Sequence, residues 1–140
     1  MRDITSYCGA VHRLAVDFYN QRADQTGLRG GLYSYLGYIY RHEGCRAEEI
    51  AACFRYEKSC VSRTLEKLEG AGLIRREADE TDGRAQRIYP TEKAVSVRQT
   101  MMDNMAEWDR RVSAALSEEE RAQLMALMEK VYRSAKEAVR

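Results

Sequence analysis

The fold is decided by the stretch EKSCVSRTLEKLEGAGLI, residues 57–74. Its apolar residues recur at spacings of three and four, which is typical of one face of a helix. These residues are Val61, Leu65 and Leu68. A second face carries residues spaced four apart, namely Ser59, Arg63 and Lys67. Either Gly70 or Gly72 can supply the left-handed residue that ends the helix.

The polar face of this helix has the chemistry of a DNA-reading surface. Small hydroxyls allow close approach to a major groove, arginine can grip guanine or a phosphate, and lysine can pair with a phosphate. The predicted DNA contacts on this helix are Lys58, Ser59, Ser62, Arg63 and Lys67. An ordinary amphipathic helix with a solvated polar face is the alternative interpretation.

The segments on either side favour a winged helix. A short helix is predicted over residues 47–54, with Arg46 at the N-cap position where Ser or Asp is usual. The link through Arg55 and Tyr56 is tight, which gives a helix-turn-helix pattern. Two strands are then predicted over residues 73–78 and 85–89. Asp82-Gly83 between them is a hairpin signal, because glycine accepts a positive φ.

The hairpin has a basic character of its own. Its arginines are Arg75, Arg76, Arg84 and Arg87. Arginine is favoured in the narrow, negative minor groove of DNA, so we expect Arg84, helped by Arg87, to hold the wing there. Acidic residues lie among these arginines, and they are Glu77, Asp79, Glu80 and Asp82. DNA binding therefore requires these acids to turn away or to pair with arginines, and a solvated turn is the alternative.

The remaining segments are predicted to be helical, so the fold class is mainly α (α+β). Helices are expected over about residues 3–22, from Leu32 to near Gly44, and from about Ala94 to Leu116, with a loop at 23–31. Thr91 is placed to cap the third of these. Ser117 to Glu120 reads as a capping box that begins a last helix.

Composition sets the outer limits. The chain has 140 residues, enough for one domain, and a formal charge of +1, so any basic surface must be local. No apolar run reaches about 18 residues and no secretion signal is visible, so we expect a cytoplasmic protein without membrane contact. The cysteines show no CxxC spacing and are expected to be reduced.

Together these patterns resemble the MarR family of bacterial transcription regulators. The specific pieces are VSR-x-L-x-x-LE-x-x-GLI-x-R at residues 61–76 and D-x-R at residues 82–84. The resemblance implies a homodimeric winged-helix repressor that binds palindromic double-stranded DNA. It implies a single domain over residues 1–140, with a DNA-binding core at about 32–91 and dimerisation helices at about 1–24 and 92–140. Release by a small aromatic ligand or by cysteine oxidation is implied as well.

By position, the resemblance places Ser59, Ser62 and Arg63 in the groove and assigns the wing structure to Asp82 and its neighbour Gly83, with Arg84 at the tip. The chain also departs from the family pattern. Gly83 replaces an arginine, which removes one wing charge, Pro90 and Ala94 replace Leu and Gly, and Arg46 replaces Ser or Thr.

Two sensors are conceivable. An aromatic ligand pocket between the second and fifth helices would be lined by Tyr33, Tyr38, Tyr40, Met101, Met105 and Trp108, although core packing explains these residues equally well. The redox candidates are Cys8 on the first helix and Cys60 on the DNA-reading helix. Cys45 and Cys53 are expected to be core residues.

The sequence offers alternatives to DNA binding, namely an enzyme, a metal site and a protein-binding module. Cys8 and His12 lie one helical turn apart, but no third group or oxyanion hole accompanies them, so a Cys-dependent enzyme is disfavoured. His12 and His42 have no evident partner ligands, so no metal or cofactor is expected. A winged helix that binds protein remains open because the wing region is nearly neutral. Steep salt dependence would distinguish DNA binding from it.

Overall fold

The computed structural model describes residues 2–140, so Met1 of the predicted N-terminal dimerisation segment lies outside the described residues. Two compact units are present, one ending at Asn104 and the other covering Met105–Arg140. The helices are α1 (Ile4–Asn20), α2 (Ala23–Thr26), α3 (Tyr33–Arg41), α4 (Ala47–Phe54), α5 (Lys58–Gly70), α6 (Glu92–Val112) and α7 (Glu118–Ala138). The strands are β1 (Ile74–Ala78) and β2 (Gln86–Pro90), and a 3-10 turn, η1, covers Gly30–Leu32. No helix among the described residues is long and apolar enough to cross a membrane.

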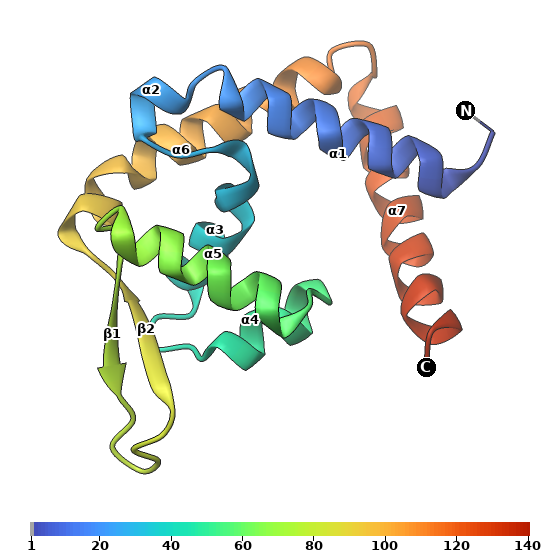
Figure 1. Ribbon diagram of the computed structural model, residues 1–140. Coiled ribbons are helices and arrows are strands. Elements are labelled where there is room, and N and C mark those ends of the chain that lie inside the picture. The colour runs from blue at the N-terminus through green and yellow to red at the C-terminus, as the bar shows by residue number, and fades with distance from the viewer. Residues whose placement is uncertain (1) are drawn as a thin grey trace. The chain divides into compact units, whose positions relative to one another are not determined.

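The first unit has the predicted winged-helix order. Figure 1 shows α4 and α5 as neighbouring helices, followed by the β1–β2 hairpin that projects beside them. On α5, Val61, Leu65 and Leu68 are fully buried, which confirms the predicted apolar stripe. They join a core whose other fully buried members include Leu28, Leu36, Ile39, Ile50, Leu73 and Ile88. Burial of this stripe fixes which face of α5 points to solvent.

The end of α5 follows one of the two predicted possibilities. Gly72 has a φ of +73°, and Gly70 is the last helical residue. The N–H of Leu73 donates to the Leu68 carbonyl at 2.9 Å, and the N–H of Gly72 donates to the Glu69 carbonyl at 2.9 Å. This pair of bonds is a Schellman motif, which glycine permits because it has no Cβ to clash in the left-handed conformation.

The start of α4 shows how Arg46 can replace a conventional N-cap. The Glu49 carboxylate accepts a hydrogen bond from the Arg46 backbone N–H at 2.6 Å. A guanidinium has no acceptor, so the Arg46 side chain cannot complete a capping box. It extends instead to Asp79, near the turn of the hairpin. Arg55, after α4, has a φ of +57° and forms the left-handed residue of the helix-turn-helix turn.

The hairpin is antiparallel, with Ile74 opposite Pro90 and Ala78 opposite Gln86. It is also joined to the segment before α4, since Ile88 and Cys45 form an isolated bridge. The Ile88 N–H donates to the Cys45 carbonyl, and the Gly44 N–H donates to the Ile88 carbonyl, both at 2.8 Å. The middle of the hairpin is thereby fixed to the helix-turn-helix. Pro90 is the last residue of β2, as its missing N–H predicts.

The predicted loop at residues 23–31 was wrong in part, because α2 lies within it and η1 begins in it. Gly27, with a φ of +70°, ends α2. Gly30 donates its N–H to the Asn20 side chain at 2.7 Å. A Cβ on Gly30 would stand 2.4 Å from the Val16 carbonyl oxygen, so only glycine fits this close approach.

The second unit contains the end of α6 and the whole of α7. Ser117 caps α7 by accepting the Glu120 N–H at 3.1 Å, while the Glu120 carboxylate accepts the Ser117 N–H at 2.8 Å. This confirms the predicted capping box. No described residue of α7 is buried, and its exposed apolar side chains include Leu124, Met125, Leu127, Met128 and Tyr132. In the first unit, α1 has a similar exposed stripe of Ile4, Tyr7, Val11 and Leu14.

Candidate nucleic-acid interface

The solvent-facing side of α5 carries every predicted contact residue of that helix. Lys58, Ser59, Ser62, Arg63 and Lys67 are all exposed. Within residues 2–140, none of these five side chains has an ion pair or hydrogen bond with another side chain or with the backbone. Glu69, on the same helix, pairs instead with Arg76 of β1, with Oε2 and Nε 2.9 Å apart. The three cations of this face are therefore not neutralised by neighbouring acids.

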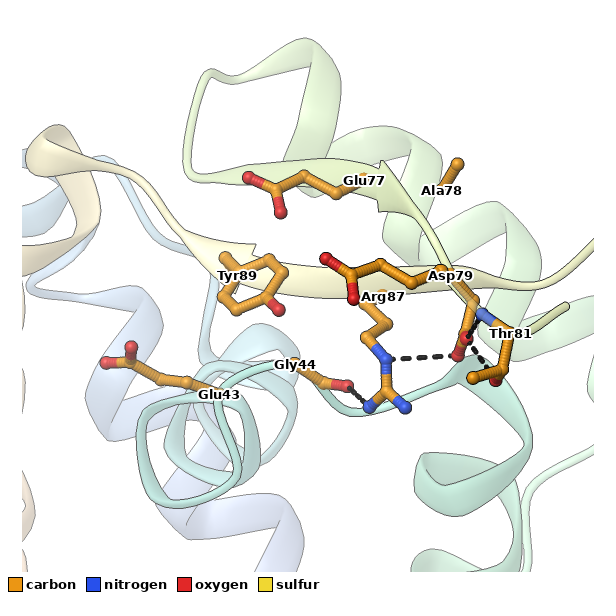
Figure 2. Close-up of a pocket in the computed structure, with 9 residues that line it drawn as sticks. Glu43, Gly44, Glu77, Ala78, Asp79, Thr81, Arg87 and Tyr89 are labelled. Carbon is orange, nitrogen blue, oxygen red and sulfur yellow. Dashed lines mark hydrogen bonds and ion pairs between the residues drawn. The ribbon is translucent and has the colours of Figure 1, made fainter. Parts of the chain in front are cut away.

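The loop at the tip of the wing is organised by a buried carboxylate. Figure 2 shows Asp79 facing Arg87, whose guanidinium also reaches Gly44. The Asp79 side chain is 1% exposed, and its Oδ2 atom lies 2.6 Å from Arg46 Nη2 and 3.0 Å from Arg87 Nε. Its Oδ1 atom accepts the Thr81 N–H at 2.9 Å and the Thr81 hydroxyl at 2.8 Å. This carboxylate therefore connects the start of α4, the hairpin turn and β2.

These contacts keep Asp79 ionised. The pKa of Asp79 is held well below its usual range, first by the hydrogen bonds from Thr81 and then by Arg46 and Arg87, against the opposing effect of burial. Because the folded-state pKa is depressed, the stabilisation is complete above the pKa of an unfolded aspartate, about 4, and is lost as the pH falls through the folded value.

We expect Asp79→Asn to destabilise the protein at neutral pH, because the amide leaves Arg46 and Arg87 without their anion. The variant should also lose less stability than the wild type as the pH falls below about 4. Urea unfolding at pH 7 and at acidic pH measures both effects. Glu80→Gln is the matched control, because Glu80 is exposed and adjacent. Equal acid sensitivity in Asp79→Asn and the wild type would show that this carboxylate has no such role.

The four wing arginines are used differently from one another. Arg75 pairs with Glu77 and lies over the Tyr89 ring at 4.6 Å, and Arg76 pairs with Glu69. Arg87 donates to the Gly44 carbonyl at 2.9 Å and pairs with Asp79, so it braces the hairpin in the half nearer its turn. Among described residues, Arg84 is the only one of the four without an ion pair.

The turn itself differs from its prediction. Gly83 does not have a positive φ, and a Cβ there would meet no atom within 4 Å. Glycine is therefore not required by the backbone, contrary to our expectation. The turn is held by aspartates: Asp82 Oδ1 accepts the Arg84 N–H at 3.1 Å, and Asp79 anchors the residues before it. This arrangement presents the exposed Arg84 at the tip.

The residues predicted to line an aromatic pocket are divided between the two units, and those of the first unit have separate contacts. Tyr33 stacks on Tyr19 with centroids 4.3 Å apart, and its hydroxyl accepts a hydrogen bond from Asn104 at 3.2 Å. Tyr38 instead lies against His42, with the ring centroids also 4.3 Å apart and the rings tilted by 34°. Met101 is fully buried, Tyr40 is buried with its hydroxyl donating to the Ala94 carbonyl, and Met105 and Trp108 belong to the second unit.

A cavity of about 370 Å³ does lie beside the wing (Figure 2). Its charged and aromatic lining residues are Glu43, Glu77, Asp79, Glu80, Arg87 and Tyr89. This lining is mainly acidic and includes none of the aromatic and methionine residues predicted to line the ligand pocket. No group of His, Cys, Asp and Glu in the described chain is arranged to hold a metal ion.

The cysteines divide into one buried and three exposed thiols. Cys45 is buried as predicted, and burial raises the pKa of its thiol to about 11. The prediction for Cys53 was wrong, because α4 buries Ile50 and Ala51 and turns Cys53 to solvent. The redox candidates Cys8, on α1, and Cys60, on α5, are both exposed.

A helix-turn-helix with a braced two-stranded wing defines the winged-helix class of DNA-binding proteins. A family model described as the MarR family matches residues 27–85. The HTH-type transcriptional regulator BilQ of Clostridium symbiosum is 32% identical over 114 residues, which cover 81% of this chain and 79% of BilQ. The chain belongs to the MarR family of transcriptional regulators.

Solved structures agree with this assignment. The crystal structure of the transcriptional regulator SlyA has a TM-score of 0.91 at 26% identity, covering 97% of this chain and 96% of SlyA. The S. aureus MepR–DNA complex has a TM-score of 0.86 at 24% identity, covering 96% of this chain and 99% of MepR, and shows the shared fold. BilQ and SlyA are transcriptional regulators, which argues against the alternative of a Cys-dependent enzyme.

Proposed function

We propose that this regulator is a homodimeric repressor that binds a palindromic operator through α5 and the wing. The observation that carries the proposal is the exposed, unpaired face of Lys58, Ser59, Ser62, Arg63 and Lys67, opposite a fully buried apolar stripe. MepR, which shares the fold, was crystallised as a complex with DNA, and this supports the same mode of binding here.

We assign the roles within this surface by side-chain chemistry. Arg63, with the small Ser59 and Ser62 beside it, reads base edges in the major groove. Lys58 and Lys67 neutralise phosphates. Arg84 enters the minor groove from the tip of the wing, and Arg87 supports it by bracing the hairpin near its turn through Asp79 and Gly44.

The homodimer is supported by apolar surface that one chain leaves uncovered. The exposed stripes of α1 and α7 are those expected of helices that pair with a second copy about a two-fold axis. In such a dimer the two α5 helices would lie about one DNA turn apart, roughly 34 Å, and would contact the two halves of a palindrome.

The first test is Arg63→Ala. The variant should weaken binding to the operator by about 1–3 kcal/mol and relax specificity, because Arg63 is assigned to base contacts. Lys67→Ala, assigned to a phosphate, should weaken binding to operator and random duplexes alike. Fluorescence anisotropy on both duplexes measures the difference. If Arg63→Ala loses equal affinity for the operator and for the random duplex, Arg63 contacts only phosphate. Unchanged affinity for the operator would show that α5 is not part of the interface.

Release of DNA is proposed to follow binding of a small aromatic ligand or oxidation of a cysteine. The exposed thiol of Cys60 on α5 supports oxidation, since an oxidised side chain there would stand within the DNA-facing helix. Gel shifts of wild type, Cys60→Ser and Cys8→Ser with peroxide and then reductant test this route. If peroxide abolishes DNA binding by the wild type and only one Ser variant still binds, the cysteine replaced in that variant is the sensor. If peroxide does not change DNA binding by the wild type, release by a small aromatic ligand is the remaining mechanism.

A further inference from the structure

The first turn of α6 holds the C-terminal end of α5. The Lys93 ammonium donates to the Ala71 carbonyl at 2.7 Å, and the Thr91 hydroxyl donates to the Gly72 carbonyl at 2.6 Å. The Thr91 N–H donates to the Leu73 carbonyl at 3.1 Å. Three successive carbonyls after α5 are therefore bound by two residues at the start of α6, which lies beside this end of α5 in Figure 1.

These bonds use carbonyls that the helix cannot satisfy alone. The last carbonyls of a helix have no partner within it, and they carry the negative end of the helix dipole. The Schellman bonds satisfy Leu68 and Glu69, whereas the carbonyl of the C-cap residue Ala71 accepts from Lys93, and that of Gly72, just beyond the helix, accepts from Thr91. A cation suits this position, and the Lys93 stem also packs against Gly72, with its Cδ 3.9 Å from where a Cβ would stand.

Thr91 fixes both helices through a single hydroxyl. Its Oγ1 atom accepts the Ala94 N–H at 3.2 Å, which caps α6, while it donates to Gly72. The start of α6 and the end of α5 therefore cannot shift independently without breaking a hydrogen bond. Lys93 is an exposed lysine, but its ammonium is directed to α5.

We propose that Thr91 and Lys93 are positioning residues for DNA binding, acting through the orientation of α5. This inference rests on the proposed function, in which α5 reads the major groove. If α5 loses these bonds, its C-terminal end gains freedom, and the side chains of Ser59 and Arg63 are held less firmly at the bases. The effect on DNA affinity should exceed the effect on stability, because the buried stripe of α5 is untouched.

The test compares Lys93→Met with Lys58→Met. Methionine keeps the unbranched stem and removes the ammonium. We expect Lys93→Met to lower operator affinity by about three- to tenfold, the range of one exposed charge-assisted hydrogen bond, with an unchanged salt slope. Lys58→Met should instead reduce the salt slope by about 1, because it removes a phosphate contact. Thr91→Ser keeps the hydroxyl and should bind as the wild type does, whereas Thr91→Val should lose affinity.

A second readout needs no DNA. Hydrogen–deuterium exchange at residues 66–73 should be faster in Lys93→Met than in the wild type, with circular dichroism showing that both are folded. If the wild type binds operator and Lys93→Met binds equally well, the positioning role is overturned. A salt slope reduced as in Lys58→Met would make Lys93 a phosphate contact instead. If the wild type binds no DNA, the proposed function fails. Unchanged exchange in Lys93→Met would separately show that Lys93 does not hold the end of α5.

Discussion

Leu127→Glu is expected to make the protein monomeric and to lower operator affinity by roughly 100-fold or more. Leu127 is 57% exposed in the single chain and lies within the apolar stripe of α7. A carboxylate buried in a dimer interface without a partner opposes association. Binding of two half-sites by two linked modules exceeds binding by one by about 10²- to 10⁴-fold, and a monomer loses this gain.

Ala126→Glu is the control for this substitution. Ala126 is also exposed on α7, but it lies on the opposite side from the stripe, so it places the same side chain outside the proposed interface. Light scattering and anisotropy should show a dimer that binds DNA normally. A dimeric Leu127→Glu variant with normal affinity would show that α7 does not form the interface.

Leu65→Ala is expected to lower the free energy of unfolding by about 2–5 kcal/mol, since it removes a buried side chain and leaves a cavity. Leu65 is 0% exposed and lies at the centre of the α5 stripe. This loss is a large part of the stability of a small domain, which is typically about 5–15 kcal/mol. Urea unfolding monitored by circular dichroism measures it.

Ser62→Ala separates folding from DNA binding on the same helix. Ser62 is exposed, so its substitution should leave the unfolding midpoint nearly unchanged while weakening operator binding. Leu65→Ala, in contrast, should mainly lower the free energy of unfolding. A Leu65→Ala variant as stable as the wild type would mean that α5 is not held by this stripe.

The features predicted correctly from sequence depend on residues close together in the chain. The α5 stripe, a left-handed glycine at either Gly70 or Gly72, the Thr91 cap and the Ser117 capping box are each set within one or two helical turns. Local chemistry of this kind is readable from spacing, because its partners are fixed by helical geometry.

The ion pairs of Asp79 with Arg46 and Arg87 could not be predicted from local spacing. Asp79 meets Arg46 across 33 residues of chain, and only the folded hairpin brings them together. Arg46 is a poor N-cap residue, and its side chain forms an ion pair with Asp79 instead. The neutral composition of the wing, which left a protein-binding function open, reflects three arginines already paired with acids.

The residues predicted to line the aromatic pocket do not share one face of α3. Tyr33 and Tyr38 are five residues apart on α3, which places them about 140° apart around a helix. They accordingly contact different neighbours, Tyr19 and His42. Cys53 was predicted to be a core residue, but it lies off the face of α4 that carries the buried Ile50 and Ala51.

The central claim, operator binding by a MarR-family dimer, is tested most directly by DNase I footprinting on the DNA upstream of the protein's own coding region at two salt concentrations. We predict protection of two half-sites about one helical turn apart, with affinity that falls steeply as salt rises. Absence of any protected site, or binding that is indifferent to salt, would contradict this claim and favour a winged helix that binds protein.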